Sequence, residues 1–365
     1  MDGLTLTDVS PVRPDEEMNW ASLEVWLKQN IPDLSGDMQV AQFHGGHANL
    51  TYCLSFEDRD LVVRRPPLGN IAPGAHDMAR EYRVLNGLAP HFDQAPKVYG
   101  FCDDNSVIGA PFITMERCQG VIIRDRLPAQ FEASPTLARD VSFALVDALV
   151  ALQSVDVELV GFGNRKRAEQ FVERQLEGWA KRWTLASDGS PDEAFERVYK
   201  ILSKTRPETK RVSVVHNDLK LDNCLFNPKD PRRVEVILDW DMTTLGDPLI
   251  EIGTLLGYWK QADDSFDRAP TIGLDMADFP SRSEITDYYC AKAGISDNLS
   301  WYEAFALWKH AVVLKQLYRR FERGESQDQR MATLPDYIPA LIEGCLLYTS
   351  PSPRDATLSR MPSSA

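Results

Sequence analysis

The sequence predicts an α+β protein of two lobes, in which an N-terminal antiparallel sheet with one helix precedes a mostly helical C-terminal lobe. The chain has 365 residues, well above the roughly 150 residues of an average domain. Short β-prone runs crowd into the first part of the chain, whereas apolar residues recur with a helical period after Gly120. We therefore expect an N-terminal lobe over 1–115, a C-terminal lobe over 116–345 and a disordered tail over 346–365.

The composition excludes several classes of protein. Hydrophobic residues make up 43% of the chain, the mean hydropathy is -0.31, and no stretch approaches the ~20 apolar residues of a membrane helix. A net charge of -14 opposes binding to nucleic acids or anionic lipids. The N-terminus lacks the basic and apolar regions of a signal peptide, which predicts a cytoplasmic protein. The six cysteines form no C-x-x-C pair, so neither disulfides nor a zinc site are expected.

The first lobe begins with a helix over 18–30, which Pro32 ends because the residue before proline leaves the helical region. A second helix over 76–88 has its apolar residues near one face, and Pro90 stops it. The β-prone runs predict a meander of three strands followed by two more, over 38–43, 50–56, 60–65, 97–102 and 111–115.

The second lobe is predicted to be helical around one β-rich island, 210–245. Helical periods run over about 135–152, 168–184, 191–204, 282–293 and 300–323. Within the island, Val212–Val215 and Val234–Leu238 are β-branched runs on either side of a polar loop. The tail is rich in Ser and Pro, has no apolar period and resembles translated vector sequence, so it contributes nothing to the fold prediction.

The polar loop of the island carries the pattern H-x-D-x-x-x-x-N, with His216, Asp218 and Asn223 at the fixed positions. Asp239 follows the second β-run, so a hairpin would bring three oxygen ligands to one end. Oxygen donors without thiolates suit Mg²⁺, and a metal beside a carboxylate suits phosphoryl transfer. The alternative is a chance turn whose aspartate caps a backbone amide, which the D-W-D and G-D-P motifs beyond the loop make less favourable.

Taken with further motifs, this block resembles the aminoglycoside phosphotransferase and choline kinase superfamily, which has a protein-kinase-like fold. Within it, the chain is most similar to the phosphotransferase domain at the N-terminus of some large acyl-CoA dehydrogenases. The resemblance extends over about 36–323. It rests on F-H-G-G-H-A-N-L-T-Y, V-V-R-R-P-P, A-R-E-Y-R-V-L, T-M-E-R, V-D-V-E-L-V-G-F-G, E-R-Q-L-E-G-W-A-K-R-W and the block from H-N-D-L-K-L-D-N to G-D-P.

The resemblance implies roles for residues of the second lobe. Asp218 would be the catalytic aspartate that holds the attacking hydroxyl, and Asn223 and Asp239 would be the Mg²⁺ ligands. Lys220 would reach the γ-phosphate, its alternative being a solvated surface lysine. His216 is interpreted as a structural residue of the loop rather than a general base.

In the first lobe, the resemblance implies an ATP-binding role for Gly45 and Gly46, which open the turn that ends at Asn49. Glycines there let backbone N–H groups approach phosphate oxygens. Arg64 would be the phosphate-binding cation of its strand, and Glu81 its acidic partner on the following helix, the alternative being a solvent-facing glutamate.

The hinge between the lobes would lie at Glu116 and Cys118, with their backbone facing adenine. Three residues depart from the family pattern. Arg64 replaces a lysine, and the two are not interchangeable at a tuned site. Asn217 replaces a glycine, which puts the loop conformation in doubt, and Glu251 stands where Asp is common.

The acceptor of the phosphoryl group is less clearly indicated. Aromatic residues are enriched over 258–308, where they either line a pocket for an apolar group or form helical core. A basic stripe on the last long helix suggests either an anionic partner or a solvated face; it consists of Lys315, Arg319 and Arg323. An acidic loop would instead attract a cationic acceptor; it contains Asp263, Asp264 and Asp267. The branch resemblance implies a hydroxyacyl group or its CoA ester.

The sequence thus predicts an ATP- and Mg²⁺-dependent kinase that phosphorylates a hydroxyl group of a small molecule. Two alternatives come from other classes of protein. One is a nucleotide-binding pseudoenzyme or regulatory module without turnover, which only Arg64 and Asn217 favour. The other is a metal-dependent hydrolase, which would not explain the Gly45–Gly46 turn or the hinge-like segment. The oligomeric state and the choice between ATP and GTP stay open.

Overall fold

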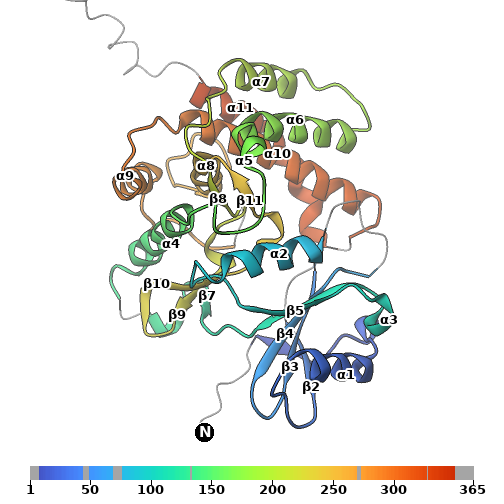
Figure 1. Ribbon diagram of the computed structural model, residues 1–365. Helices are drawn as coiled ribbons and strands as arrows, with labels where there is room; N and C mark the ends of the chain where they lie inside the picture. Colours follow the sequence, from blue (N-terminus) through green and yellow to red (C-terminus); the bar gives the residue numbers. More distant parts are fainter. Residues whose placement is uncertain are drawn as a thin grey trace, which may run out of the picture. The chain divides into compact units, whose positions relative to one another are not determined.

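The computed structural model describes residues 8–43, 49–68, 76–131, 134–268, 273–326 and 328–349 (Figure 1). The chain divides into two compact units, each assembled from three segments. Unit 1 comprises Met1–Gly120, Glu158–Phe162 and Glu235–Thr243, and unit 2 comprises Val121–Val157, Gly163–Val234 and Thr244–Ala365. Two segments from the second part of the chain therefore belong to the N-terminal unit, which the sequence did not indicate.

Unit 1 is built on a six-stranded antiparallel sheet with the strand order β1-β2-β3-β4-β6-β5. The predicted meander is confirmed, with β3 and β4 paired from Leu50 opposite Arg65 to Ser55 opposite Asp60. The strands are β1 (Val9–Ser10), β2 (Gln39–Phe43), β3 (Leu50–Ser55), β4 (Asp60–Arg65), β5 (Val98–Cys102) and β6 (Phe112–Glu116). Strand β1 escaped prediction because two residues are too short to show an alternating pattern.

Helices α1 (Trp20–Asn30) and α2 (Met78–Leu88) pack on the sheet of unit 1 (Figure 1). From α1, Leu23 joins the core that contains Val63 of β4. Because neighbouring residues of a strand point to opposite faces, Arg64 faces the other side, where α2 packs against β5 and β6. The sheet thus carries α1 as well as α2, with the short helix α3 (Asn105–Ile108) at one edge.

Unit 2 is mostly helical, and the five helices predicted for it are confirmed. Helix α10 packs against α8, α11 and α6. The helices are α4 (Leu137–Gln153), α5 (Arg165–Glu169), α6 (Phe171–Ala186), α7 (Glu193–Lys204), α8 (Pro248–Tyr258), α9 (Arg282–Ala293), α10 (Ser300–Glu322) and α11 (Ile338–Thr349). Helix α8 escaped prediction because every residue from Pro248 to Gly257 is buried, so its sequence shows no polar face and no helical period.

The predicted hairpin of the β-rich island is wrong. Strand β8 (Ser213–Val215) pairs with β11 (Thr244–Gly246). Strand β10 (Asp230–Ile237) instead belongs to a three-stranded sheet of order β10-β9-β7, with β9 (Cys224–Asn227) and β7 (Val121–Ile122). The reason is that Cys224–Asn227, directly after the loop, forms a strand of its own and takes the neighbouring position that the prediction gave to β8.

The segment predicted to be a disordered tail begins inside a helix. Residues 346–349 continue α11, whose buried side chains include Leu341, Ile342 and Cys345. Residues 350–365 lie outside the described residues. Among the helices of the described ranges, none combines the length and the apolar character needed to cross a membrane.

Candidate active site

Arg64 forms the centre of a charged cluster in unit 1. Its guanidinium contacts the carboxylate of Glu81 (Nη1–Oε1, 3.3 Å) and that of Asp239 (Nη2–Oδ1, 2.5 Å). With the Asn49 amide oriented so that both of its groups are satisfied, Asn49 Oδ1 accepts from Arg64 Nε at 3.0 Å, and its nitrogen donates to His76 Nδ1 at 2.9 Å. Three residues predicted to serve nucleotide or metal binding therefore contact the guanidinium of a fourth, Arg64.

The electrostatics of this cluster follow from burial. Glu81 is 1% exposed, and its Oε2 has no hydrogen-bond partner among the described residues. Burial raises the pKa of Glu81 to about 7, which the charge of Arg64 opposes. Burial lowers the pKa of Arg64, but the charges of Glu81, Asp239 and Asp241 outweigh it, so the pKa lies above its ordinary value. Arg64 therefore keeps its charge and stabilises the buried carboxylate.

Asp218 lies in the loop between β8 and β9 of unit 2, and three side chains contact its carboxylate. Asn223 Nδ2 donates to Asp218 Oδ2 at 3.1 Å and to its backbone oxygen at 2.8 Å. Lys220 Nζ lies 3.5 Å from Asp218 Oδ2, and the Tyr258 hydroxyl donates to Oδ1 at 3.3 Å. Asp218 remains 23% exposed, so its carboxylate is both held and accessible.

The backbone just before Asp218 is anchored by buried charges. Asn217 has φ 69°, in the left-handed region that asparagine tolerates best after glycine, which explains why it can replace a glycine here. The carboxylate of Glu251 accepts from the backbone N–H of His216 at 2.7 Å and of Asn217 at 2.8 Å. Lys309 Nζ donates to the Asn217 carbonyl at 3.2 Å. His216 is fully buried, in keeping with its interpretation as a structural residue.

The predicted metal ligands come from separate units. Asn223 belongs to unit 2 and turns its amide nitrogen towards Asp218, so its carbonyl oxygen points away from that residue. Asp239 belongs to unit 1, has φ 69° and a side chain 37% exposed. Both offer oxygen donors, the chemistry that Mg²⁺ requires. The described parts of each unit contain no group of three His, Cys, Asp or Glu residues able to hold a metal.

The remaining predicted nucleotide-binding residues differ in what the structure shows. Gly45 and Gly46 lie outside the described residues. At the end of β6, the backbone N–H of Glu116 donates to the Lys97 carbonyl at 2.9 Å, and the Glu116 side chain accepts from Lys97 N at 2.7 Å. The thiol of Cys118 donates to the Glu116 carbonyl at 3.9 Å, and burial raises the pKa of Cys118 to about 12. Cys118 is therefore a neutral thiol near physiological pH.

The charged groups considered for acceptor binding are engaged within unit 2. Arg319 and Arg323 both contact the carboxylate of Asp188, and Lys315 Nζ lies 5.7 Å from the centre of the Trp183 ring. The loop carboxylates pair with local cations, Asp264 with Arg268 and Arg282, and Asp267 with Lys260. Asp263 instead accepts a hydrogen bond from the Gln261 side chain at 3.1 Å.

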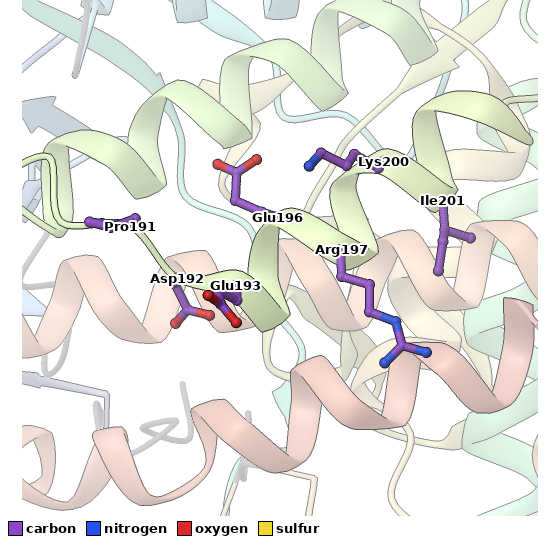
Figure 2. Close-up of a pocket in the computed structure, with 7 residues that line it drawn as sticks. All are labelled: Pro191, Asp192, Glu193, Glu196, Arg197, Lys200 and Ile201. Atoms are coloured by element: carbon purple, nitrogen blue, oxygen red, sulfur yellow. The ribbon is translucent and has the colours of Figure 1, made fainter.

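The aromatic residues of unit 2 mainly form core. Trp308 is fully buried and stacks on Phe195, which stacks in turn on Trp183. A surface hollow of about 520 Å³ lies beside α7, and Figure 2 shows the residues that line it: Pro191, Asp192, Glu193, Glu196, Arg197, Lys200 and Ile201. None of the predicted site residues lines it. Trp259, Tyr289, Tyr302 and Trp308 are buried in the packed interior, whereas Tyr258 contacts Asp218.

Two contacts of the loop were not found from the sequence. In the sequence, Tyr258 is distinguished only as an aromatic residue, and nothing local indicates that it touches Asp218. Lys309 stands in the run F-A-L-W-K-H-A-V-V-L, where a lysine among apolar residues is the one available signal of a buried charge with a partner.

Comparison with known proteins shows the family to which this chain belongs. The model of the APH phosphotransferase enzyme family matches residues 39–284, and the chain belongs to that family. Mouse acyl-CoA dehydrogenase family member 10 is 31% identical over 328 residues, which cover 88% of this chain and 30% of that protein. The chain spans less than half the length of this relative and of the rat and mouse members 11.

Solved structures agree on the fold. A putative aminoglycoside phosphotransferase from Ralstonia eutropha superposes with a TM-score of 0.76 at 27% identity, covering 91% of this chain and 98% of that one. The aminoglycoside phosphotransferase APH(4)-Ia, in a ternary complex with AMP-PNP and hygromycin B, has a TM-score of 0.55 at 17% identity, covering 90% and 98%. The predicted kinase-like α+β fold is therefore confirmed.

Proposed function

We propose that this chain transfers the γ-phosphoryl group of ATP, with Mg²⁺, to a hydroxyl group of a small molecule, and that the acceptor is a hydroxyacyl group or its CoA ester. The observation that carries the proposal is the loop at Asp218, where a partly exposed carboxylate is held by Asn223, Lys220 and Tyr258 in a member of a phosphotransferase family. Such a carboxylate can orient an acceptor hydroxyl and receive its proton.

The residues divide the work as follows. The acceptor oxygen bonds to the γ-phosphorus while the bond to the β,γ-bridging oxygen breaks, and Asp218 takes the proton of the hydroxyl. Lys220, 3.5 Å from Asp218, supplies positive charge for the transferred group. Arg64 binds phosphate oxygens with its planar fork. Asn223 and Asp239 would hold Mg²⁺, which neutralises charge on the phosphate oxygens.

Different observations support the assignment of the nucleotide and that of the acceptor. A structural relative was crystallised with AMP-PNP, and the carboxylates of Glu81 and Asp239 meet at Arg64, a permanently charged side chain suited to phosphate. For the acceptor, the curated relatives are named acyl-CoA dehydrogenase family members, which favours acyl chemistry over an antibiotic. This acceptor assignment is an analogy at the level of the family.

The test is transfer of label from γ-labelled ATP, with Mg²⁺, to a panel of hydroxy acids, hydroxyacyl-CoAs, amino alcohols and aminoglycosides. Asp218→Asn should abolish the labelled product while ATP binding by calorimetry persists. Asp297→Asn is the matched control, because the Asp297 side chain is also 23% exposed and pairs with a lysine, Lys210, whereas no ion pair joins it to a predicted site residue in the described chain. We expect it to retain transfer.

Three results would contradict the proposed phosphoryl transfer, and a fourth would contradict the acceptor assignment. Equal transfer by wild type and Asp218→Asn would remove the role of Asp218. Nucleotide binding without transfer to any acceptor class would favour a pseudoenzyme, and phosphate release from a substrate without ATP would favour a metal-dependent hydrolase. A product formed only from aminoglycosides would overturn the acyl assignment alone.

A further inference from the structure

Lys309 is a buried cation on α10 that the proposed chemistry does not use directly. Its side chain belongs to a residue only 4% exposed, and its ammonium donates to the backbone carbonyl of Asn217 at 3.2 Å. The ammonium also lies 5.5 Å from the centre of the Trp179 ring. Burial lowers the pKa of Lys309, and the charges of Asp218 and Glu251 oppose that shift. A cation in this position must be compensated by what it binds.

Lys309 binds Asn217, the residue directly before Asp218 in the loop. Asn217 has φ 69°, and its two backbone groups are held by opposite charges. Its N–H donates to Glu251 Oε1 at 2.8 Å, and its carbonyl accepts from Lys309. Because N–H and carbonyl lie on the two peptide planes that φ and ψ rotate, fixing both fixes both angles.

Close packing of two helices brings these charges to the loop. Glu251 lies on α8 and Lys309 on α10, which pack against each other. A Cβ added at Gly253 would lie 2.7 Å from the Tyr302 backbone oxygen, and one added at Gly257 would lie 2.7 Å from Ala306 Cβ. The absence of these side chains allows the short distance between the helices that lets both charged residues reach Asn217.

We propose that Lys309 is a positioning residue of the active site, which holds the Asn217 carbonyl so that the following residue, Asp218, presents its carboxylate to the acceptor hydroxyl. Lys309 does not touch a substrate. It acts through the peptide that joins Asn217 to Asp218. The role in catalysis rests on the proposed function, whereas the effect on the loop does not, and the two are measured separately.

The test compares Lys309→Met with Lys315→Met. Lys315 is the matched control, because it lies on the same helix with its ammonium over a tryptophan ring, and among the described residues it donates no hydrogen bond to the loop. Hydrogen–deuterium exchange of the segment 213–223 is measured without nucleotide. We expect exchange in this segment to rise roughly 10- to 100-fold in Lys309→Met, while segments of α6 and α8 and the control variant stay unchanged.

A second variant separates position from general stability. Lys309→Gln keeps a donor for the Asn217 carbonyl without the charge, so it should restore part of the exchange protection and part of the turnover even if Lys309→Met folds poorly. In transfer assays, kcat should fall roughly 10-fold or more in Lys309→Met with little change in the KM for ATP, since no phosphate contact is lost.

Unchanged exchange in the segment 213–223, or a rise of equal size throughout unit 2, would overturn the proposal. So would an equal loss of kcat in Lys315→Met. If wild type shows no transfer but the exchange result holds, the phosphotransferase assignment fails and the anchoring of the loop by Lys309 stands.

Discussion

Replacing Arg64 with methionine tests whether the charges of unit 1 stabilise one another. The substitution keeps a side chain of similar length but removes the contacts to Glu81 at 3.3 Å and to Asp239. Glu81, 1% exposed, then has no cation beside it. Removing one partner of a buried ion pair costs about 3–5 kcal/mol of unfolding free energy, because the other charge stays buried without compensation.

The unfolding free energy lost in Arg64→Met should depend on pH, because Glu81 titrates. Its pKa of about 7, against an ordinary 4.5, means that the folded protein binds this proton more tightly than the unfolded chain. Raising the pH from below 4.5 to above about 7 therefore lowers the unfolding free energy, by roughly 3 kcal/mol in total. Without Arg64 the pKa of Glu81 rises further and the decline continues above pH 7. The deficit of Arg64→Met should thus be small near pH 5.5 and large near pH 8.5.

The assay is urea unfolding followed by tryptophan fluorescence at both pH values. Arg65→Met is the matched control, because the neighbouring Arg65 is also buried but donates to the carbonyls of Ile108 and Pro66 rather than to a carboxylate. Its deficit should be the same at both pH values. The double variant Arg64→Met/Glu81→Leu should recover most of the loss, since no uncompensated charge remains. A deficit independent of pH, or a double variant no more stable than Arg64→Met, would refute the reasoning.

Three further substitutions probe other features. Asn217→Gly should change the free energy of unfolding by less than about 1 kcal/mol, whereas Asn217→Val should lower it by about 2 kcal/mol or more because a β-branched residue is strained at φ 69°. Equal melting curves for the two variants would contradict this. Gly87→Ala should lose about 1–3 kcal/mol, since the new Cβ would lie 1.9 Å from the Val160 carbonyl oxygen, and a neutral result in denaturant unfolding would show that this contact relaxes freely. Tyr258→Phe removes the donor 3.3 Å from Asp218 and should lower kcat roughly 2- to 10-fold with the KM for ATP unchanged; an effect on KM alone would assign Tyr258 to binding instead.

Much of the fold could be predicted because its elements carry a period. The helices of unit 2 with one apolar face and the strands of the meander in unit 1 appear in the structure close to their predicted bounds. Where the period is absent the prediction failed, as for α8, which is buried on all sides, and for β1, which is two residues long. The pairing of β8 with β11 could not be read from adjacent runs, because strand partners depend on the whole topology.

Some contacts of the candidate site could be predicted from the sequence and others could not. The contacts of Arg64 with Glu81, and of Asp218 with Asn223, join residues whose motifs are recognisable in the sequence. The contact of Lys309 with Asn217 joins residues 92 positions apart, and it exists only because α8 and α10 approach closely. No local pattern encodes that approach. The sequence therefore indicates candidate site residues with recognisable motifs more readily than the distant residues that contact them.

The interleaving of the two units along the chain has a consequence for synthesis on the ribosome. Trp240, 1% exposed, and Asp239, the partner of Arg64, both belong to the last segment of unit 1. After residue 120 has been made, more than a hundred residues of translation precede that segment, which at ~5–20 residues per second takes on the order of 6–25 s. During that time unit 1 lacks both Trp240 and the carboxylate that pairs with Arg64, so its fold is incomplete. A truncation near residue 120 would lack both groups permanently and would be a substrate for chaperones that bind incomplete domains.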